Sequence, residues 1–324
     1  MCTAAGFVNG GLYFGRNLDY EFSYGESVTV TPRHFPFSLR HMGEMKEHYA
    51  MIGMAHVAGG VPLYYDGMNE KGLCIAGLNF VGNAVYGRPV EGKTNIAQFE
   101  LIPWILGSCA DLSDVKKAAK KLVITDTPFN DRMPVAQMHW LIGDKTGFIV
   151  LEQQADGLHV YDDPAGVLTN NPPFPVQNFA LNNYAGLSPK TPENRFGKNI
   201  PLESYSRGMG AIGLPGDLSS QSRFIRAAFV TANSLAPQTE EESVSQFFHI
   251  LTSVEQQRGC CELPGEKYEI TIYSSCCSAE TGTYYYTTYE NRQLTAVSLF
   301  HEDLEGKEAV VYPMRSHQAV QWEN

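Results

Sequence analysis

The spacing of apolar and polar residues divides the chain into alternating groups of strands and helices. Residues 3–8 and 12–19 are apolar stretches separated by an Asn-Gly-Gly turn, which is typical of a β-hairpin. Alternating or short apolar runs that end at turn residues predict the next strands. These lie at residues 27–31 and 49–57, and within 63–80, where two strands flank the turn MNEKG.

Helical spacing appears at residues 95–110 and at 111–124, where Asp111 or Ser113 is the candidate N-cap. Residues 136–163 then predict a meander of three strands. Three helices and a β-rich C-terminal part follow. The helices are expected at 178–187, at 219–236 with Ser219 or Ser220 as N-cap and at 239–254 with Thr239 as N-cap, and the strands at 268–276, 283–290 and 294–300. Elements grouped in this order predict an α+β fold with two antiparallel sheets and helices on the outside.

Composition and charge restrict the function classes. Of the 324 residues, 43% are hydrophobic and 18% are charged, and the chain has no internal repeat or break in composition. We therefore expect one large domain. The formal net charge of −11 argues against nucleic acid or an anionic membrane surface as a partner, because both attract basic patches. With no membrane-spanning apolar run and no leader-like N-terminus, a cytoplasmic protein is expected.

Seven cysteines raise the question of a metal or redox site. They are Cys2, Cys74, Cys109 and the adjacent pairs Cys260–Cys261 and Cys276–Cys277. An odd number in a long chain fits reduced thiols better than a disulfide framework. Adjacent cysteines direct their side chains apart, unlike the two-residue spacing of a zinc knuckle. We expect packing residues and no metal or other cofactor, with a thiol redox or zinc protein as the alternative.

Cys2 has a position that suggests chemistry. Removal of Met1, which is efficient before a small residue, would leave a chain that begins with a thiol and a free α-amine. An α-amine is a proton acceptor suited to neutral pH. One residue would then carry both a nucleophile and its base, as in N-terminal nucleophile enzymes. The alternative is a cysteine that follows the initiator methionine by chance.

Arg16 and Asp19 are charged residues that the predicted hairpin returns toward Cys2. A cation at Arg16 would favour the thiolate, and a carboxylate at Asp19 would orient the α-amine. Their spacing of three places them on opposite faces of a strand unless the strand bends at Asn17–Leu18. Taken alone, Arg16 and Asp19 fit a solvated turn or a surface ion pair better than a catalytic role.

Several segments together resemble the choloylglycine hydrolase family, which contains the conjugated bile acid hydrolases and the penicillin V acylases. The resemblance begins at MCTA, YFGRNLD and SVTVTPR. It continues through DGMNEKGLCIAGLNF, LTNNPPF, LNNYAGLSP and GLPGDLSSQSRFIRAAF, in the expected order over nearly the whole chain. It implies a four-layer αββα N-terminal nucleophile fold over residues 2–324 and the hydrolysis of an amide bond. Within that family, Cys2 would be the nucleophile, Arg16 would lie beside its thiol and Asp19 would bind the α-amine.

The same resemblance implies three more polar roles. Asn170 would donate its side-chain amide to the oxyanion, and Asn79 would donate its backbone N–H. Arg223 would complete the polar network. Without the resemblance, the Asn residues of TNNPP are ordinary turn residues. Asn171 and Arg226 are the alternatives for Asn170 and Arg223.

The motifs GLNF and LTNNP match the bile acid branch, whereas penicillin V acylases typically have tyrosine in place of Asn79. The resemblance therefore implies conjugated bile acids as substrates, with both glycine and taurine conjugates cleaved. A rigid steroid requires a broad apolar pocket. The candidate wall residues are Tyr20, Phe22, Tyr24, Val61, Leu63, Tyr65, Phe80 and Val81.

Other functions stay open from the sequence. One is an amidase of the same family that acts on penicillin V or N-acyl homoserine lactones, and another is a non-catalytic protein that binds small molecules with the same fold. Residues 185–218 are rich in Gly, Pro, Ser and Asn and are long for a structureless connection. The resemblance implies a homotetramer in which this segment contacts a neighbour, and the alternative is a plain surface loop.

Overall fold

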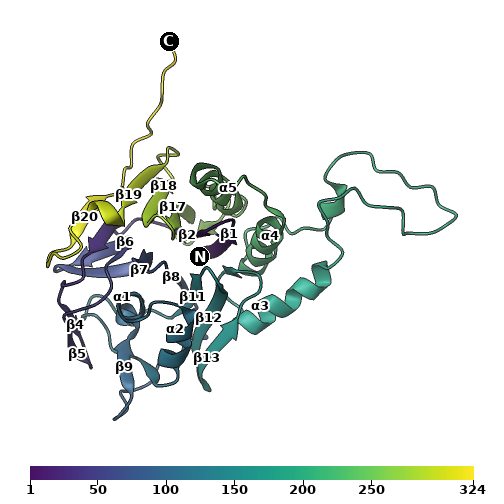
Figure 1. Ribbon diagram of the computed structural model, residues 1–324. Coiled ribbons are helices and arrows are strands. Elements are labelled where there is room, and N and C mark those ends of the chain that lie inside the picture. The colour runs from purple at the N-terminus through teal and green to yellow at the C-terminus, as the bar shows by residue number, and fades with distance from the viewer.

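Two large antiparallel sheets lie face to face at the centre of the protein (Figure 1). The computed structural model describes residues 1–324. The first sheet has six strands in the order β14 (Val167–Leu168), β1 (Cys2–Val8), β2 (Leu12–Tyr20), β17 (Ile270–Ser278), β18 (Thr283–Thr288) and β19 (Thr295–Ser298). Strand β1, which begins at Cys2, is therefore paired on both sides.

The second sheet has eight strands, and one of its edge strands comes from the C-terminal part of the chain. Their order is β13 (Gly157–Asp162), β12 (Gly147–Gln154), β11 (Met138–Asp144), β8 (Cys74–Asn79), β7 (Val61–Asn69), β6 (Met51–Ala58), β3 (Ser27–Thr31) and β20 (Val310–Pro313). Three two-stranded sheets complete the β-structure. They are β4 (Phe37–Leu39) with β5 (Gly43–Met45), β9 (Thr94–Ala97) with β10 (Leu122–Thr125), and β15 (Glu262–Leu263) with β16 (Lys267–Tyr268).

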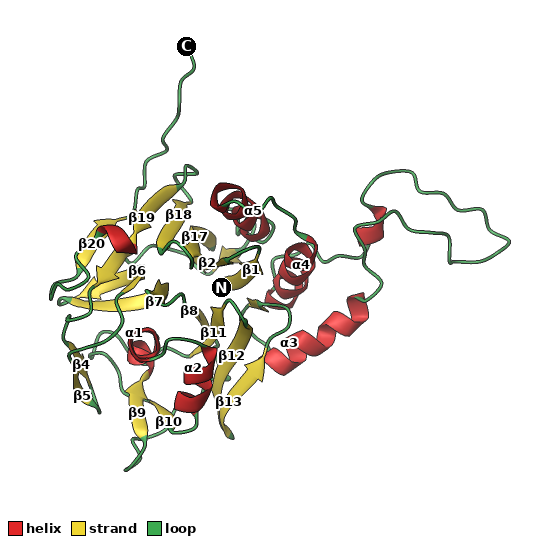
Figure 2. Cartoon of the chain, in the orientation of Figure 1, coloured by secondary structure: helices red, strands yellow, loops and turns green.

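Helices cover the outer faces of both large sheets (Figure 2). Helices α1 and α2 pack on the eight-stranded sheet, and α4 and α5 pack on β1, β2 and β17 of the six-stranded sheet. The helices are α1 (Leu101–Ser108), α2 (Leu112–Ala119), α3 (Phe174–Ala180), α4 (Ser220–Asn233) and α5 (Glu240–Thr252). One apolar cluster joins the two sheets with α4 and α5, and a second fills the space beneath α1 and α2. The expected four-layer αββα architecture is confirmed.

Turn and capping residues explain why several elements begin and end where the sequence predicts. Gly10 has a φ of +72° in the turn between β1 and β2, a conformation that glycine adopts without strain. Asp111 is the N-cap of α2 and accepts the N–H of Asp114 at 2.9 Å. Thr239 is likewise the N-cap of α5.

Three expectations about element boundaries were wrong. The helix expected over residues 95–110 begins only at Leu101, after β9 and a 3₁₀ turn, and Pro103 lies in its first turn, where the missing N–H costs little. The helix expected over 111–124 ends at Ala119, and its last apolar residues form β10, parallel to β9. Helix α3 begins at Phe174, several residues before the expected start.

The segment between α3 and α4 extends away from the rest of the molecule as a long loop (Figure 1). Most of residues 185–218 have no regular structure, as predicted, apart from the 3₁₀ turn Met209–Ala211. The two ends of this loop meet where the N–H of Ser188 donates to the carbonyl of Gly210 at 2.9 Å. We call residues 189–209 the arm. No helix in the structure has the length and apolar character needed to cross a membrane.

Candidate active site

Cys2 lies at the start of β1, with its side chain on the face that looks toward the second large sheet. Cys2 pairs with Leu18, and Ala4 pairs with Arg16, so the side chains of Cys2 and Arg16 share one face of the hairpin. Arg16 is 1% exposed and its Nη1 donates to the carbonyl of Tyr65 at 3.2 Å. A cation held beside a thiol favours the thiolate, which is the nucleophilic form.

The electrostatics of Arg16 are dominated by its burial and its anionic neighbours. Burial lowers the pKa of Arg16, but Cys2, Tyr273 and Asp66 raise it by more, so that the net pKa lies above the ordinary arginine value. Arg16 Nη1 also donates to the carbonyl of Gly77, while Nη2 is buried without a hydrogen-bond partner. A permanent positive charge is therefore fixed within the core, on the side of the thiol.

Asp19 points to the opposite face of β2 from Arg16, toward α4, as the unbent strand requires. Its Oδ1 accepts the hydroxyl of Thr271 at 2.6 Å, and its Oδ2 lies 3.9 Å from Arg223 Nη1. Oδ2 has no hydrogen-bond partner although the residue is fully buried. Burial raises the pKa of Asp19, and Arg223, the chain's ammonium group and Thr271 offset part of that rise. The pairing of β2 with β17 has an irregularity in β17, between Thr271 and Tyr273, opposite Asp19 and Leu18.

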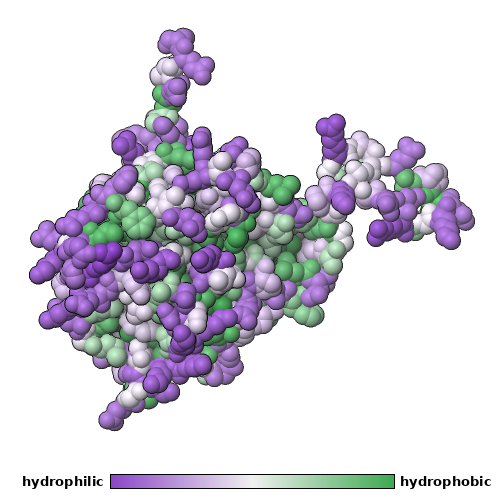
Figure 3. Space-filling model, viewed as in Figure 1, coloured by the Kyte–Doolittle hydropathy of each residue, from purple (hydrophilic) through white to green (hydrophobic).

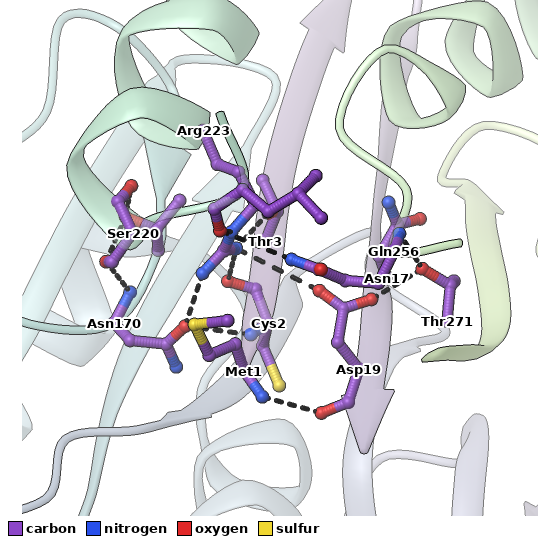
Figure 4. A network of polar contacts seen from close by, with 12 residues as sticks. Met1, Cys2, Thr3, Asn17, Asp19, Asn170, Ser220, Arg223, Gln256 and Thr271 are labelled. Atoms are coloured by element: carbon purple, nitrogen blue, oxygen red, sulfur yellow. Dashed lines mark hydrogen bonds and ion pairs between the residues drawn. The ribbon is translucent and has the colours of Figure 1, made fainter. Parts of the chain in front are cut away.

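Arg223 and Asn170 meet at the backbone of Cys2 (Figure 4). Arg223 Nη1 donates to the carbonyl of Cys2 at 2.5 Å and to the hydroxyl of Thr3 at 2.6 Å, and Nη2 donates to Asn170 Oδ1 at 2.9 Å. Asn170 Oδ1 also accepts the N–H of Cys2 at 2.8 Å. Asn170 Nδ2 donates to the carbonyl of Asn79 at 2.9 Å. Because an amide NH₂ has two donors, one N–H of Asn170 stays available for a ligand.

Asn170 is fixed by hydrogen bonds to its backbone as well. Its N–H donates to Ser220 Oγ at 2.9 Å, in the first turn of α4. Its carbonyl accepts Gln177 Nε2 of α3 at 2.6 Å. Two helices and the end of β14 therefore determine where the Asn170 amide points.

Met1 extends β1 by one residue in this form of the chain. The N–H of Asp19 donates to the carbonyl of Met1 at 2.9 Å, and the Met1 ammonium donates to the carbonyl of Asp19 at 2.7 Å. The ammonium also forms an ion pair with the buried carboxylate of Glu269. While Met1 is present, the nitrogen of Cys2 is an amide, which is not a base.

Sequence reasoning missed several polar residues of this network. Thr271 positions Asp19, Glu269 pairs with the terminal ammonium, and the backbone N–H of Gln256 donates to Thr271 Oγ1 at 2.8 Å. Glu269 and Thr271 are two residues apart, directly before and within the start of β17, so they lie on one side of the chain there. That alternation was the available signal, but only pairing of β17 with β2 connects it to Cys2.

The candidate wall residues fall into different surroundings. The rings of Tyr20, Phe22 and Tyr24 form one cluster with centroid distances of 4.8–5.5 Å, and Phe22 and Tyr24 are 44% and 48% exposed. Tyr65 and Leu63 lie on β7, whose backbone contacts Arg16. Val61 and Val81 are exposed. Phe80, by contrast, is fully buried and stacks on His139 at 4.3 Å between centroids. A role in binding stays a prediction for all eight.

The cysteine pairs lie away from any cluster of metal-ligand type. Cys276 and Cys277 are fully buried in β17, whereas Cys260 is exposed. No group of three or more His, Cys, Asp or Glu side chains is placed to hold a metal ion.

Comparison with known proteins identifies the family. A model of the linear amide C–N hydrolases of the choloylglycine hydrolase family matches residues 2–312. The chain belongs to the choloylglycine hydrolase family. It is 55% identical to a bile salt hydrolase/transferase of Lactiplantibacillus plantarum over 98% of both chains, and 39% identical to one of Clostridium perfringens over 96% of both. It is therefore an amide hydrolase.

Solved structures agree with this assignment. The crystal structure of the C2A mutant of the conjugated bile acid hydrolase from Clostridium perfringens superposes with a TM-score of 0.92 over the whole of both chains, at 37% identity. The penicillin V acylase from Agrobacterium tumefaciens has a TM-score of 0.73 at 18% identity, over 95% of this chain and 90% of that one. The second likeness concerns the fold alone.

In this choloylglycine hydrolase, Asp163 closes the turn that leads into β14 and Asn170. Its carboxylate accepts the N–H groups of Ala165, Gly166 and Val167 at 2.9–3.0 Å. Burial raises the pKa of Asp163 to about 7, and the three backbone N–H bonds oppose the rise. The folded state thus binds this proton more tightly than the unfolded chain, whose aspartates titrate near about 3.9.

A raised carboxyl pKa fixes the sign of a pH effect. The stability that the Asp163 proton contributes is complete below about pH 4 and is lost as the pH rises through about 7. We expect Asp163→Asn to remove this pH dependence and to cost about 1 kcal/mol through one lost backbone hydrogen bond. Urea unfolding of the variant and the wild type across this pH range measures both effects. Parallel pH curves for the two proteins would rule out the assigned titration.

Proposed function

We propose that the protein hydrolyses the amide bond of glycine- and taurine-conjugated bile acids, with Cys2 as its nucleophile. The observation that carries the proposal is the arrangement of polar and charged residues around Cys2. Its thiol shares a strand face with Arg16, its backbone is held by Asn170 and Arg223, and Asp19 lies beside the terminal amine position. The relative with 55% identity over nearly the full length is named a bile salt hydrolase/transferase, which supports the substrate class.

Acylation begins with attack of Cys2 Sγ on the carbonyl carbon of the scissile amide. The thiol proton passes to the α-amine of Cys2, which is free once Met1 has been removed. The amide carbonyl becomes an oxyanion, which accepts the second N–H of Asn170 and the backbone N–H of Asn79. A pre-placed oxyanion donor is worth about 3–4 kcal/mol at comparable sites.

Collapse of the tetrahedral intermediate breaks the C–N bond, and the α-ammonium returns its proton to the departing amine. The bile acyl group then remains on Cys2 as a thioester. Water attacks the thioester carbonyl, gives its proton to the α-amine, and releases the carboxylic acid while the thiol is regenerated. The protons balance over the cycle without a metal or cofactor.

The surrounding contacts are arranged for an α-amine that serves as the base. Asn170 Oδ1 already accepts one N–H from the nitrogen of Cys2, which orients the nitrogen in place. Asp19 Oδ2 has no hydrogen-bond partner. Once Met1 has been removed, it can accept an N–H of the Cys2 α-amine. Arg223, which contacts Asn170 and approaches Asp19, fixes the two acceptors relative to each other.

The aromatic cluster of Tyr20, Phe22 and Tyr24 supports an apolar ligand close to Cys2. Tyr20 ends the strand that carries Arg16 and Asp19, and the rings beyond it are partly exposed. We propose that these rings contact the steroid, with Leu63 and Tyr65 of β7 on the other side.

Parallel assays with glycocholate, taurocholate and penicillin V test the proposed substrate. We expect release of glycine and taurine from the bile conjugates and much slower cleavage of penicillin V. Preferential cleavage of penicillin V would assign the chain to the acylase activity, and no cleavage of either bile conjugate would contradict the proposal.

We also propose a reducing compartment such as the cytoplasm, because all seven cysteines are unpaired.

We further propose a homotetramer in which the arm packs on a neighbouring copy. The arm carries Phe196 and Tyr205, which are 79% and 86% exposed, together with half-exposed Ile200 and Leu202. Figure 3 shows hydrophobic residues on the surface of this extended segment. Apolar side chains of this size at the end of an extended loop gain stability only when another surface covers them. The resemblance of the sequence to the family supports the same assembly.

Light scattering on the purified protein tests this assembly. We expect a tetramer for the wild type and a smaller species when residues 191–207 are replaced by a short Gly-Ser linker. The linker is compatible with the fold because Ser188 and Gly210 are joined at the base of the arm. Removal of residues 320–324, which are exposed, is the matched control and should leave the tetramer intact. A monomeric wild type would contradict the assembly.

A further inference from the structure

A histidine and a glutamate form a fully buried pair beneath the proposed oxyanion site. His139 lies on β11 and Glu152 on the neighbouring β12, and both side chains have no exposed surface. His139 Nδ1 lies 2.9 Å from Glu152 Oε1. Neither residue takes part in the proton transfers proposed above, and the desolvation cost of burying such an ionisable pair can exceed the free energy gained from the pairing.

His139 contacts both segments that carry the proposed oxyanion donors. Its Nε2 lies 2.8 Å from the carbonyl of Thr169, the residue before Asn170. Its ring stacks on Phe80, the residue after Asn79, with an interplanar angle of 7°. One rigid imidazole thus joins the Asn79 segment to the Asn170 segment, which are about ninety positions apart in the sequence.

Both ring nitrogens of His139 face acceptors, so the pair must hold two protons. Nε2 donates its proton to the carbonyl of Thr169, and the second proton lies between Nδ1 and Glu152. Wherever that second proton resides, the pair is neutral overall and both contacts are made. Glu152 is anchored in turn, because it accepts the N–H of Phe174 at 3.0 Å and Nε2 of Gln154 at 3.1 Å.

We propose that His139, oriented by Glu152, is a positioning residue for the oxyanion donors. Through the Thr169 carbonyl and the Phe80 ring it sets the separation and direction of the Asn170 amide and the Asn79 N–H. Oxyanion donors act on charge that develops in the transition state, so a small displacement lowers the rate of the chemical step and leaves substrate binding nearly unchanged. The inference rests on the oxyanion roles given under the proposed function.

Two variants separate the contact with Thr169 from the contact with Glu152. Glutamine at position 139 can place its amide N–H near the Nε2 position and can still reach the Thr169 carbonyl. Asparagine is shorter and reaches only the region of Nδ1. Because either change would leave Glu152 buried without the partner that shares its proton, each is combined with Glu152→Gln, whose side chain is neutral.

The experiment measures kcat and KM for His139→Asn/Glu152→Gln and His139→Gln/Glu152→Gln. We expect kcat to fall by about 100-fold in the asparagine variant, with KM changed by less than about threefold, and partial recovery of kcat in the glutamine variant. The matched control is His159→Gln. His159 forms a histidine–carboxylate pair with Asp156 at 2.8 Å on the outer strand β13, and this change should leave kcat unaltered.

The possible results have distinct meanings. Thermal unfolding shows whether each variant is folded. A folded variant with the kcat of the wild type, whether its KM is unchanged or raised, would overturn the positioning role. The comparison uses whichever of glycocholate, taurocholate or penicillin V the wild type cleaves. Failure of the wild type on both bile conjugates therefore counts against the proposed substrate, and equal rates of wild type and variants count against the positioning role.

Discussion

Replacement of Cys2 by alanine is expected to reduce turnover by about 10⁴-fold or more, because the change removes the sulfur atom that forms the thioester in the proposed mechanism. Stability should change little. Cys2 is the first residue of β1, and the contacts that hold it are made by its backbone: Asn170 accepts its N–H and Arg223 donates to its carbonyl. The C2A mutant of the Clostridium perfringens relative has a crystal structure that superposes on this chain. Steady-state hydrolysis of glycocholate measures the loss, and thermal unfolding measures the stability.

Two further variants control this experiment. Cys2→Ser keeps a hydroxyl but loses the polarisable sulfur, so it should retain at most a trace of activity. Cys260→Ala removes an exposed thiol elsewhere on the chain and should retain full activity. Normal turnover in Cys2→Ala would leave the Cys2 mechanism without support.

A chain that keeps any residue before Cys2 is expected to be inactive, an effect as large as loss of the thiol. The nitrogen of Cys2 is then an amide, which cannot accept the thiol proton. The residue before it also remains in the β1 ladder, where Met1 pairs with Asp19 and binds Glu269. We expect the fraction of catalytically active chains in a preparation to equal the fraction that lacks Met1.

A cleavable extension makes this test reversible. A short leader that ends in a protease site directly before Cys2 should give a folded, inactive chain, and cleavage should restore activity. The same leader on Cys2→Ala should stay inactive after cleavage. If pairing of β1 in the folded chain makes the protease site inaccessible, the leader is cleaved in mild denaturant and the chain is then refolded. Full activity of the uncleaved form would mean that the α-amine is not the base.

The sequence predicts best those elements that specific turn and capping residues delimit. The β1–β2 hairpin and the N-terminus of α5 are of this kind, because glycine at positive φ and threonine at an N-cap act locally. Strands β9, β10 and β20 are not delimited by residues of this kind. Each has four residues, and each becomes a strand because a partner strand lies beside it. Strand β20 also ends in Pro313, which is tolerated because β20 is at the edge of its sheet.

The site divides in the same way. Period-two alternation in β2 correctly separates Arg16 from Asp19, but it does not reveal which face of the strand meets the second sheet. Polar residues such as Glu152 and His139 fit the sequence pattern of solvated positions, yet both are fully buried. Their burial depends on a partner in another strand, so it follows from the tertiary structure and not from any local pattern.

The measurement that tests the proposed mechanism most directly is the intact mass of the protein stopped by acid during turnover of glycocholate. We expect a chain lighter by one methionine that carries the cholyl group, with peptide mapping placing the group on Cys2. We also expect the adduct to disappear when turnover is complete. Turnover without an adduct, or an adduct on another residue or on chains that retain Met1, would contradict a Cys2 thioester formed with the help of its own α-amine.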